Sequence, residues 1–327
     1  MNCISKFLAA AAVACSFAAP SIASAQAYPA KPIRLVIPWP AGGAADFVGR
    51  AVAEGMRKDL NQTIIVDNKP GATGRIGIDA VRSSPADGYT LVLAISNTHG
   101  VAPALYPKLP YDPVSDFTPV GVAAIGPLAL AVRATLPVKT LPELIDYAKR
   151  NPGKLNFASA GPGSGSHLMG EMLRAMAGVD IVHVPYKGTA PAVNDLAAGV
   201  VDMIFEGAAI KPFVADGRLR VLATTGTKRW SAYPDVPTTA EAGFPKLLSA
   251  SWFGIMGPKG MPQPIVARLN QSLLAALKNP QVQSSLKTQG IDVATATSPA
   301  DMASFITSET ERWKANLKLI NYTHKAE

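Results

Sequence analysis

Two segments of the 327-residue chain place glycines and small side chains between a predicted strand and a predicted helix. The first glycine loop, residues 38–46, includes Trp39, Ala41, Gly42, Gly43, Ala44, Ala45 and Asp46. The second glycine loop, residues 159–167, includes Ser159, Ala160, Gly161, Gly163, Ser164 and His167. The first N–H groups of a helix lack partners within the helix, and the helix dipole adds positive charge there. Each loop is therefore a candidate anion site that needs no lysine or arginine.

Neither glycine loop contains a lysine or an arginine, so backbone N–H groups would be the main donors to a bound anion. The hydroxyl groups of Ser159, Ser164 and Ser166 add further donors in the second loop. Taken alone, each loop also fits a plain tight connection between a strand and a helix. The similarity of the two loops and their placement in different halves of the chain favour a shared binding role.

Several other polar and aromatic side chains fit either a ligand contact or a structural role. His167 begins a predicted helix, where ligand contact and packing fit equally well. Glu206 ends a short apolar strand, and strand ends are where α/β proteins bind ligands, although a solvated turn is the alternative. Trp39 and Phe47 flank the first glycine loop and fit the core better than a ligand platform. Asn97 follows a strand and is a turn former first and a ligand contact second.

The sequence patterns of several enzyme classes are absent. The run Gly161-Pro162-Gly163 lacks the third glycine of a dinucleotide-binding fingerprint. Ser164 lies directly between two glycines, which does not fit the nucleophile elbow of hydrolases. None of the four histidines has a partner at a metal-ligand spacing. We therefore predict no catalytic residues, no metal and no cofactor.

The first 25 residues have the pattern of a signal peptide. Lys6 supplies a positive charge, Phe7–Ala19 is apolar, and Ala23-Ser24-Ala25 fits a cleavage site. Both cysteines, Cys3 and Cys15, lie in this leader, so we expect no disulfide or thiol chemistry in the mature chain. The alternative to cleavage after Ala25 is lipid attachment at Cys15, but Ala12-Val13-Ala14-Cys15 matches the lipobox pattern poorly. The pattern predicts export to the periplasm of a Gram-negative cell.

The charge and hydropathy patterns exclude two further classes. The formal net charge is +8, but the basic residues are spread along the chain rather than clustered, so we predict no nucleic-acid partner. No stretch after the leader has the length and apolar character of a membrane span. A hydrophobic content of 48% supports a large core, and the length suggests two domains.

Strand and helix signals alternate along the chain, which is typical of an α/β protein. The predicted strands are Ile33–Ile37, Thr63–Val66, Leu91–Ile95, Leu155–Ala158, Ile181–Val184, Met203–Phe205, Leu219–Ala223 and Trp252–Met256. The predicted helices are Ala44–Leu60, Leu141–Arg150, His167–Ala177, Ala190–Ala198, Pro264–Lys278 and Pro299–Leu319. Apolar segments that restart near residues 128 and 252 predict domain crossings there. One domain would comprise residues 26–125 and 251–327, and the other residues 126–250.

Ordered motifs along nearly the whole chain after the leader resemble one family. They include YPAKPIRLVIPWPAGGAADFVGR, NKPGATGRIGIDAV, PADGYTLVLA, FASAGPGSGSHLMGEML, HVPYKGTAPAVNDLAAGVVDMIFE and PDVPTTAEAGF. This pattern resembles the substrate-binding proteins of the tripartite tricarboxylate transporters, the Bug family of periplasmic receptors. The resemblance implies a fold similar to type II periplasmic binding proteins, in which two α/β domains enclose a ligand cleft.

The resemblance also implies roles for individual residues. A carboxylate would be held between the two glycine loops, partly through ordered waters, with Tyr186 facing the cleft and Glu206 at a strand end where the family often has an acid. One segment departs from the family: it has Ala102-Pro103 where an Asn-Pro pair is usual, which affects the local ligand contact.

The function that these features predict is capture of a small organic acid and its delivery, by a monomer, to the permease subunits of such a transporter. A binding protein that serves a sensor is the first alternative, and an exported hydrolase is the second. The lack of a catalytic constellation argues against the hydrolase. The ligand would be a dicarboxylate, a tricarboxylate, an acidic amino acid or an aromatic acid, and the sequence does not distinguish among these.

Overall fold

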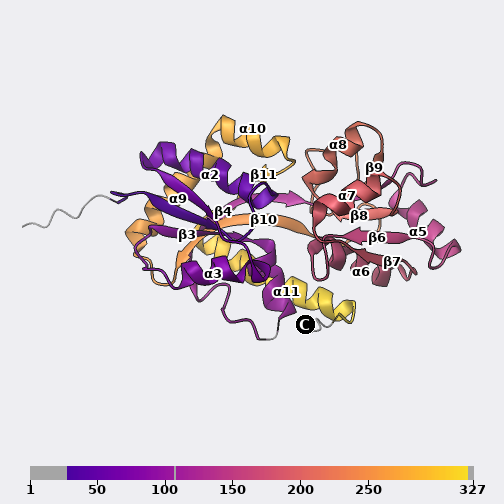
Figure 1. Ribbon diagram of the computed structural model, residues 1–327, viewed down its shortest axis with the longest axis horizontal. Coiled ribbons are helices and arrows are strands. Elements are labelled where there is room, and N and C mark those ends of the chain that lie inside the picture. The colour runs from indigo at the N-terminus through magenta and orange to yellow at the C-terminus, as the bar shows by residue number, and fades with distance from the viewer. Residues whose placement is uncertain (1–27, 107, 323–327) are drawn as a thin grey trace, which may run out of the picture.

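The computed structural model describes residues 28–106 and 108–322. The leader predicted from the sequence, with Cys3, Cys15 and the cleavage site, lies outside the described residues. The described strands form two sheets, and helices cover both of them (Figure 1). The predicted α/β class with two domains is confirmed. No helix among residues 28–106 and 108–322 is long and apolar enough to cross a membrane.

The first sheet has six strands in the order β11-β4-β10-β3-β1-β2. Strand β1 pairs in parallel with β2 and β3, whereas β10 runs antiparallel to both β3 and β4. The strands are β1 (Ile33–Ile37), β2 (Ile64–Asn68), β3 (Thr90–Ile95), β4 (Phe117–Pro127), β10 (Ala250–Pro258) and β11 (Asp292–Val293). The helices of this part are α2 (Ala44–Leu60), α3 (Arg75–Arg82), α4 (Ala102–Leu105), α9 (Gln263–Lys278), α10 (Pro280–Thr288) and α11 (Pro299–Leu319), with short turns η2 (Ala72–Gly74) and η3 (Asn97–Val101).

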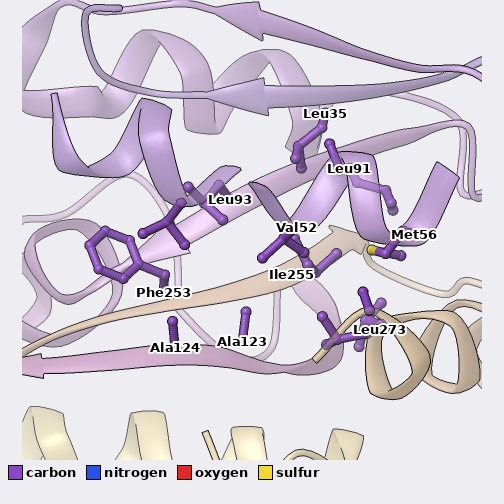
Figure 2. Close-up of a cluster of buried hydrophobic side chains, with 14 of the residues drawn as sticks. Leu35, Val52, Met56, Leu91, Leu93, Ala123, Ala124, Phe253, Ile255 and Leu273 are labelled. Carbon is purple, nitrogen blue, oxygen red and sulfur yellow. The ribbon is translucent and has the colours of Figure 1, made fainter. Parts of the chain in front are cut away.

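One face of this sheet is sealed by two helices. Leucines of β1 and β3 meet Val52 and Met56 of α2 and Leu273 of α9 in a buried cluster (Figure 2). The helices approach closely because α2 carries Gly55 at their contact, where an added Cβ would lie 2.7 Å from the Cβ of Ala276. This packing fixes the axis of α2, and therefore the direction in which its N-terminus points.

The second sheet has five strands in the order β7-β6-β8-β5-β9. Its central strands β6 and β8 are parallel, and β5 is antiparallel to β8 and β9. The strands are β5 (Ala129–Arg133), β6 (Asn156–Ser159), β7 (Val182–Pro185), β8 (Met203–Glu206) and β9 (Leu219–Thr224). The helices are α5 (Leu141–Arg150), α6 (Gly165–Ala177), α7 (Thr189–Ala197) and α8 (Lys211–Ala215), with the short turn η4 (Ala208–Ile210).

The chain passes between the sheets where β4 gives way to β5 and where the segment after β9 leads into β10 (Figure 1). The domain division expected from the sequence, residues 26–125 with 251–327 and residues 126–250, stays a prediction. Helix α11 departs from a strict division, because its Trp313 and Leu317 are buried in a cluster with side chains of the second sheet, such as Leu130 and Phe157.

Candidate ligand-binding cleft

Among the connected cavities between the two sheets, three border the glycine loops. The largest, of about 560 Å³, is bounded by the first glycine loop on one side and by the start of α7 and the end of β8 on the other. A second cavity of about 150 Å³ shares Thr189, Glu206 and Ser251 with it. A third of about 160 Å³ shares Asn97 and Ser164 with the second. The three form one continuous cleft to which both sheets contribute.

The cleft brings together nine of the residues predicted as ligand contacts. They are Trp39, Gly42, Gly43, Ala44, Asn97, Ala160, Gly163, Ser164 and Glu206. Seven predicted residues do not line it: Ala41, Ala45, Asp46, Ser159, Gly161, His167 and Tyr186. The hydroxyl of Tyr186 instead donates to the Asp195 carboxylate at 2.7 Å, and burial is the main cause that raises the pKa of Tyr186 to about 12.

The first glycine loop is held by one buried carboxylate. Asp46 accepts hydrogen bonds from the Gly42 N–H, from Nε of Arg50 and from Nδ2 of Asn68, each at 3.0 Å. The hydrogen bond from Arg50 is the main reason why the pKa of Asp46 falls to about 2. Gly42 has a φ of +84°, a conformation that an L side chain rarely adopts. Asp46 therefore shapes the loop from behind and does not face the cleft.

The N-terminus of α2 is left open by this arrangement. Its N-cap residue is Gly43, which has extended backbone geometry and no side chain that could cap the helix. No hydrogen bond from the N–H of Ala44 or Ala45 to a side chain is found among the described residues. Gly43 and Ala44 line the largest cavity. The first N–H groups of this 17-residue helix are thus available to an anion in the cleft, while the charge of Asp46 in its first turn is paired with Arg50.

The second glycine loop differs, because its own side chains take up most of its N–H groups. The acceptors are Ser166 Oγ for the Ala160 N–H, Ser159 Oγ for Gly161, His167 Nδ1 for Gly163 and Ser164 Oγ for His167, at 3.0–3.3 Å. The Ser164 N–H donates to the Gly161 carbonyl at 3.1 Å. The N–H groups of Gly161 and Gly163 are therefore engaged within the loop, and their predicted contact with an anion stays a prediction.

Two histidines support the second loop from behind. The rings of His167 and His183 stack with centroids 4.1 Å apart, and His183 Nε2 lies 2.7 Å from Ser159 Oγ. Burial, followed by the nearby His183, lowers the pKa of His167 to about 4, and burial also lowers the pKa of His183. His167 is neutral near pH 7, as it must be for its Nδ1 to accept the Gly163 N–H. Of the two roles open to His167, the contacts show packing and loop support.

Glu206 lies at the end of β8 and lines both the largest and the second cavity. Its Oε2 accepts from Thr189 Oγ1 at 3.0 Å, and its Oε1 accepts from the Gly207 N–H at 2.8 Å. Burial is the largest influence on its carboxyl and raises the pKa. Thr189 begins α7, whose N-cap, Gly188, also offers no side-chain cap. The strand-end position predicted for Glu206 therefore does face the cleft.

Comparison with known proteins decides the family. The model of the tripartite tricarboxylate transporter family receptor matches residues 48–322. The chain belongs to this receptor family. Protein BugT of Bordetella pertussis is 38% identical over 292 residues, 89% of this chain and 89% of BugT. The periplasmic binding protein BugD is similar with a TM-score of 0.79 and 35% identity, over 91% of this chain and 100% of BugD. R. palustris Rpa4515 with adipate has a TM-score of 0.80 and 36% identity, over 90% and 98%.

The receptor cleft contains residues that sequence reasoning missed. Thr189, Trp230, Ser251 and Trp313 line it but come from four separate segments. Thr189 had a usable signal, because it follows Gly188 at the start of a predicted helix. Trp230 had none: its role depends on a hydrogen bond from its Nε1 to the Gly290 carbonyl at 2.5 Å, which links the segment after β9 to the one after α10.

The three cavities that border the glycine loops contain little charge, whereas the adjoining cavity is lined by Lys228, Arg229, Asp292, Glu309 and Arg312. Among the described residues that line these three cavities, Glu206 is the one acid, and there is no lysine, arginine or histidine. Within residues 28–106 and 108–322, no group of three or more His, Cys, Asp or Glu side chains could hold a metal ion. A ligand would therefore be recognised by helix ends, hydroxyls, apolar surfaces and Glu206.

Proposed function

We propose that the protein is a periplasmic receptor that captures a small carboxylate in the cleft and passes it to the permease subunits of a tripartite tricarboxylate transporter. The observation that carries the proposal is the uncapped N-terminus of α2, which opens into the largest cavity through Gly43 and Ala44. Membership of the receptor family and the adipate in the similar Rpa4515 support a carboxylate ligand.

The geometry suits a carboxylate for a physical reason. Two adjacent free N–H groups at a helix start match the two oxygens of a carboxylate, and the helix dipole favours its negative charge. Charge-assisted hydrogen bonds of this kind are worth about 1.5–3 kcal/mol each. The cleft also has room, because cavities of several hundred Å³ hold small ligands.

The partners follow from the same proposal. The two-domain receptor would act as a monomer, take up its ligand in the periplasm and require neither a cofactor nor a nucleic acid. Binding without turnover fits a cleft whose described lining residues contain one acid and no lysine, arginine or histidine.

A thermal-shift screen over mono-, di- and tricarboxylates and amino acids, followed by titration calorimetry, tests the proposal. A ligand at a hundredfold excess over Kd stabilises the folded state by about 2.7 kcal/mol. For a chain of this size, the midpoint of unfolding should then rise by roughly 5–10 °C. Native mass spectrometry of the purified protein provides an independent check for a co-purified acid. If none of the carboxylates shifts the midpoint or binds in calorimetry, the proposed function is wrong.

A further inference from the structure

The largest cavity has two ends of opposite polarity. Gly42, Gly43 and Ala44 place the positive N-terminus of α2 at one end, and the carboxyl group of Glu206 lies at the other. No lysine, arginine or histidine among the described lining residues offsets this carboxyl group. A ligand that spans the cavity therefore meets donors at one end and an acceptor at the other.

The hydrogen bonds of Glu206 show which partner it lacks. An ionised carboxylate has about four acceptor positions, and Glu206 uses two of them, for Thr189 Oγ1 and for the Gly207 N–H. Both of its oxygens act as acceptors in these two hydrogen bonds. The remaining positions have no donor among the described residues. Glu206 lines the cavity with these acceptor positions unfilled, so a ligand that supplies a donor there gains affinity.

We propose that Glu206 makes the receptor select a carboxylate that carries an ammonium group, or another strong hydrogen-bond donor, at its far end. A second ligand carboxylate at that place would face Glu206 with the same charge, and like charges in such a site repel. The α2 N-terminus would hold the ligand's carboxylate. This inference rests on the proposed function, since it assumes that a carboxylate occupies the cleft.

Matched ligand pairs test the inference directly. Adipate and 6-aminohexanoate both contain six carbons and differ at one end, where the carboxylate of adipate is replaced by a CH2–NH3⁺ group. Succinate and 4-aminobutanoate form a shorter pair. Titration calorimetry at pH 8 should show that, in the pair whose length fits, the amino acid binds at least tenfold more tightly than the dicarboxylate.

The variant Glu206→Gln should reduce this preference to less than about threefold, because the charge that discriminates is gone. Glu54→Gln is the control, since it removes one negative charge from an exposed site on α2, where Glu54 pairs with Arg57. It should keep the wild-type preference. Thermal unfolding of both variants checks that they fold.

The outcomes separate the two proposals. Equal affinity for both members of a pair, or a dicarboxylate that binds more tightly with uptake of a proton, overturns the selectivity and leaves the carboxylate receptor intact. A preference that persists in Glu206→Gln also overturns it. If these four compounds and the carboxylate panel all fail to bind, the proposed function fails, and the selectivity fails with it. The relative affinities of wild type for the two members of a pair test the selectivity even if Glu206→Gln does not fold.

Discussion

The two glycine loops look alike in sequence and are built differently. Both lead from a strand into a helix, and both contain glycines at positive φ, such as Gly42 and Gly163. In the first loop, one carboxylate behind the chain holds Gly42 and leaves the start of α2 uncapped. In the second, Ser164 caps α6 and His167 takes the Gly163 N–H.

The difference teaches that a glycine-rich turn before a helix is an anion site only when its own side chains do not occupy the donors. In the second loop, serines and a histidine accept the N–H groups of Ala160, Gly161, Gly163 and His167. Gly43 and Ala45, at the places of Ser164 and Ser166, have no side-chain acceptor, so the start of α2 has no side-chain cap. The Gly42 N–H is nevertheless taken by Asp46, just as the Gly163 N–H is taken by His167. The side chains within each loop therefore decide how many of its N–H groups are left for a ligand.

The largest expected effect is on binding at the first loop. Ala44→Asp places a carboxylate at the start of α2, where it occupies the free donors and repels the ligand's carboxylate. We expect the affinity for the identified carboxylate to fall at least about 100-fold, equivalent to about 2.7 kcal/mol, with unchanged or slightly higher stability. Calorimetry and thermal unfolding measure the two quantities.

Gly165→Asp is the matched change at the start of α6, because Gly165 also lines the cleft and an added Cβ has room, 3.9 Å from Leu128 Cδ1. Here the loss should be less than about tenfold, since the side chains of the second loop already use most of its donors. A larger loss at Gly165 than at Ala44 would reverse the roles assigned to the two loops.

The next effect concerns the stability of the first loop. Asp46→Asn removes the charge that Arg50 and the Gly42 N–H stabilise and should cost about 1–3 kcal/mol near pH 7. Because the folded-state pKa of Asp46 is lowered to about 2, its contribution exists above the unfolded pKa and is lost as pH falls from about 4 to 2. Denaturant unfolding at several pH values should show that the free energy of unfolding falls less steeply below pH 4 in the variant than in wild type. An equally steep fall in the variant and in wild type contradicts this account.

The second loop should show a different pH dependence. The pKa of His167 is lowered to about 4 in the folded state, so protonation favours the unfolded chain. The contribution of His167 is present above pH 6.5 and is lost as pH falls toward 4. We expect wild type to lose about 1–2 kcal/mol between pH 7 and pH 5 from this residue. In His167→Gln, whose amide oxygen can still accept the Gly163 N–H, this loss should disappear from unfolding curves.

The smallest effects come from the caps themselves. Ser164→Ala removes the acceptor of the His167 N–H and should reduce stability by about 1 kcal/mol, a shift of roughly 2–4 °C. Gly43→Ala, at the equivalent position of the first loop, removes no side-chain cap and has space for a Cβ, so calorimetric stability should change by less than about 0.5 kcal/mol. Equal losses in the two variants would mean that the α2 start is capped after all.

The sequence by itself determined the elements with strong local signals. Helices α2 and α11 have the predicted bounds, because apolar residues recur at helical spacing along them. Strand β4 and helices α3 and α10 were not predicted. Strand β4 contains Pro119, Gly121 and Gly126, which normally mark turns, yet pairing with β10 along nearly its whole length holds it extended.

Only the tertiary structure decided what the candidate residues do. Local sequence indicated that both glycine loops precede helices and that Glu206 ends a strand. It did not indicate that His167 reaches back to Gly163, that Thr189 donates to Glu206, or that Trp230 meets Gly290. Hydrogen-bond partners depend on distances of about 3 Å between side chains that folding brings together, and such distances are set by packing across the whole domain rather than by neighbours along the chain.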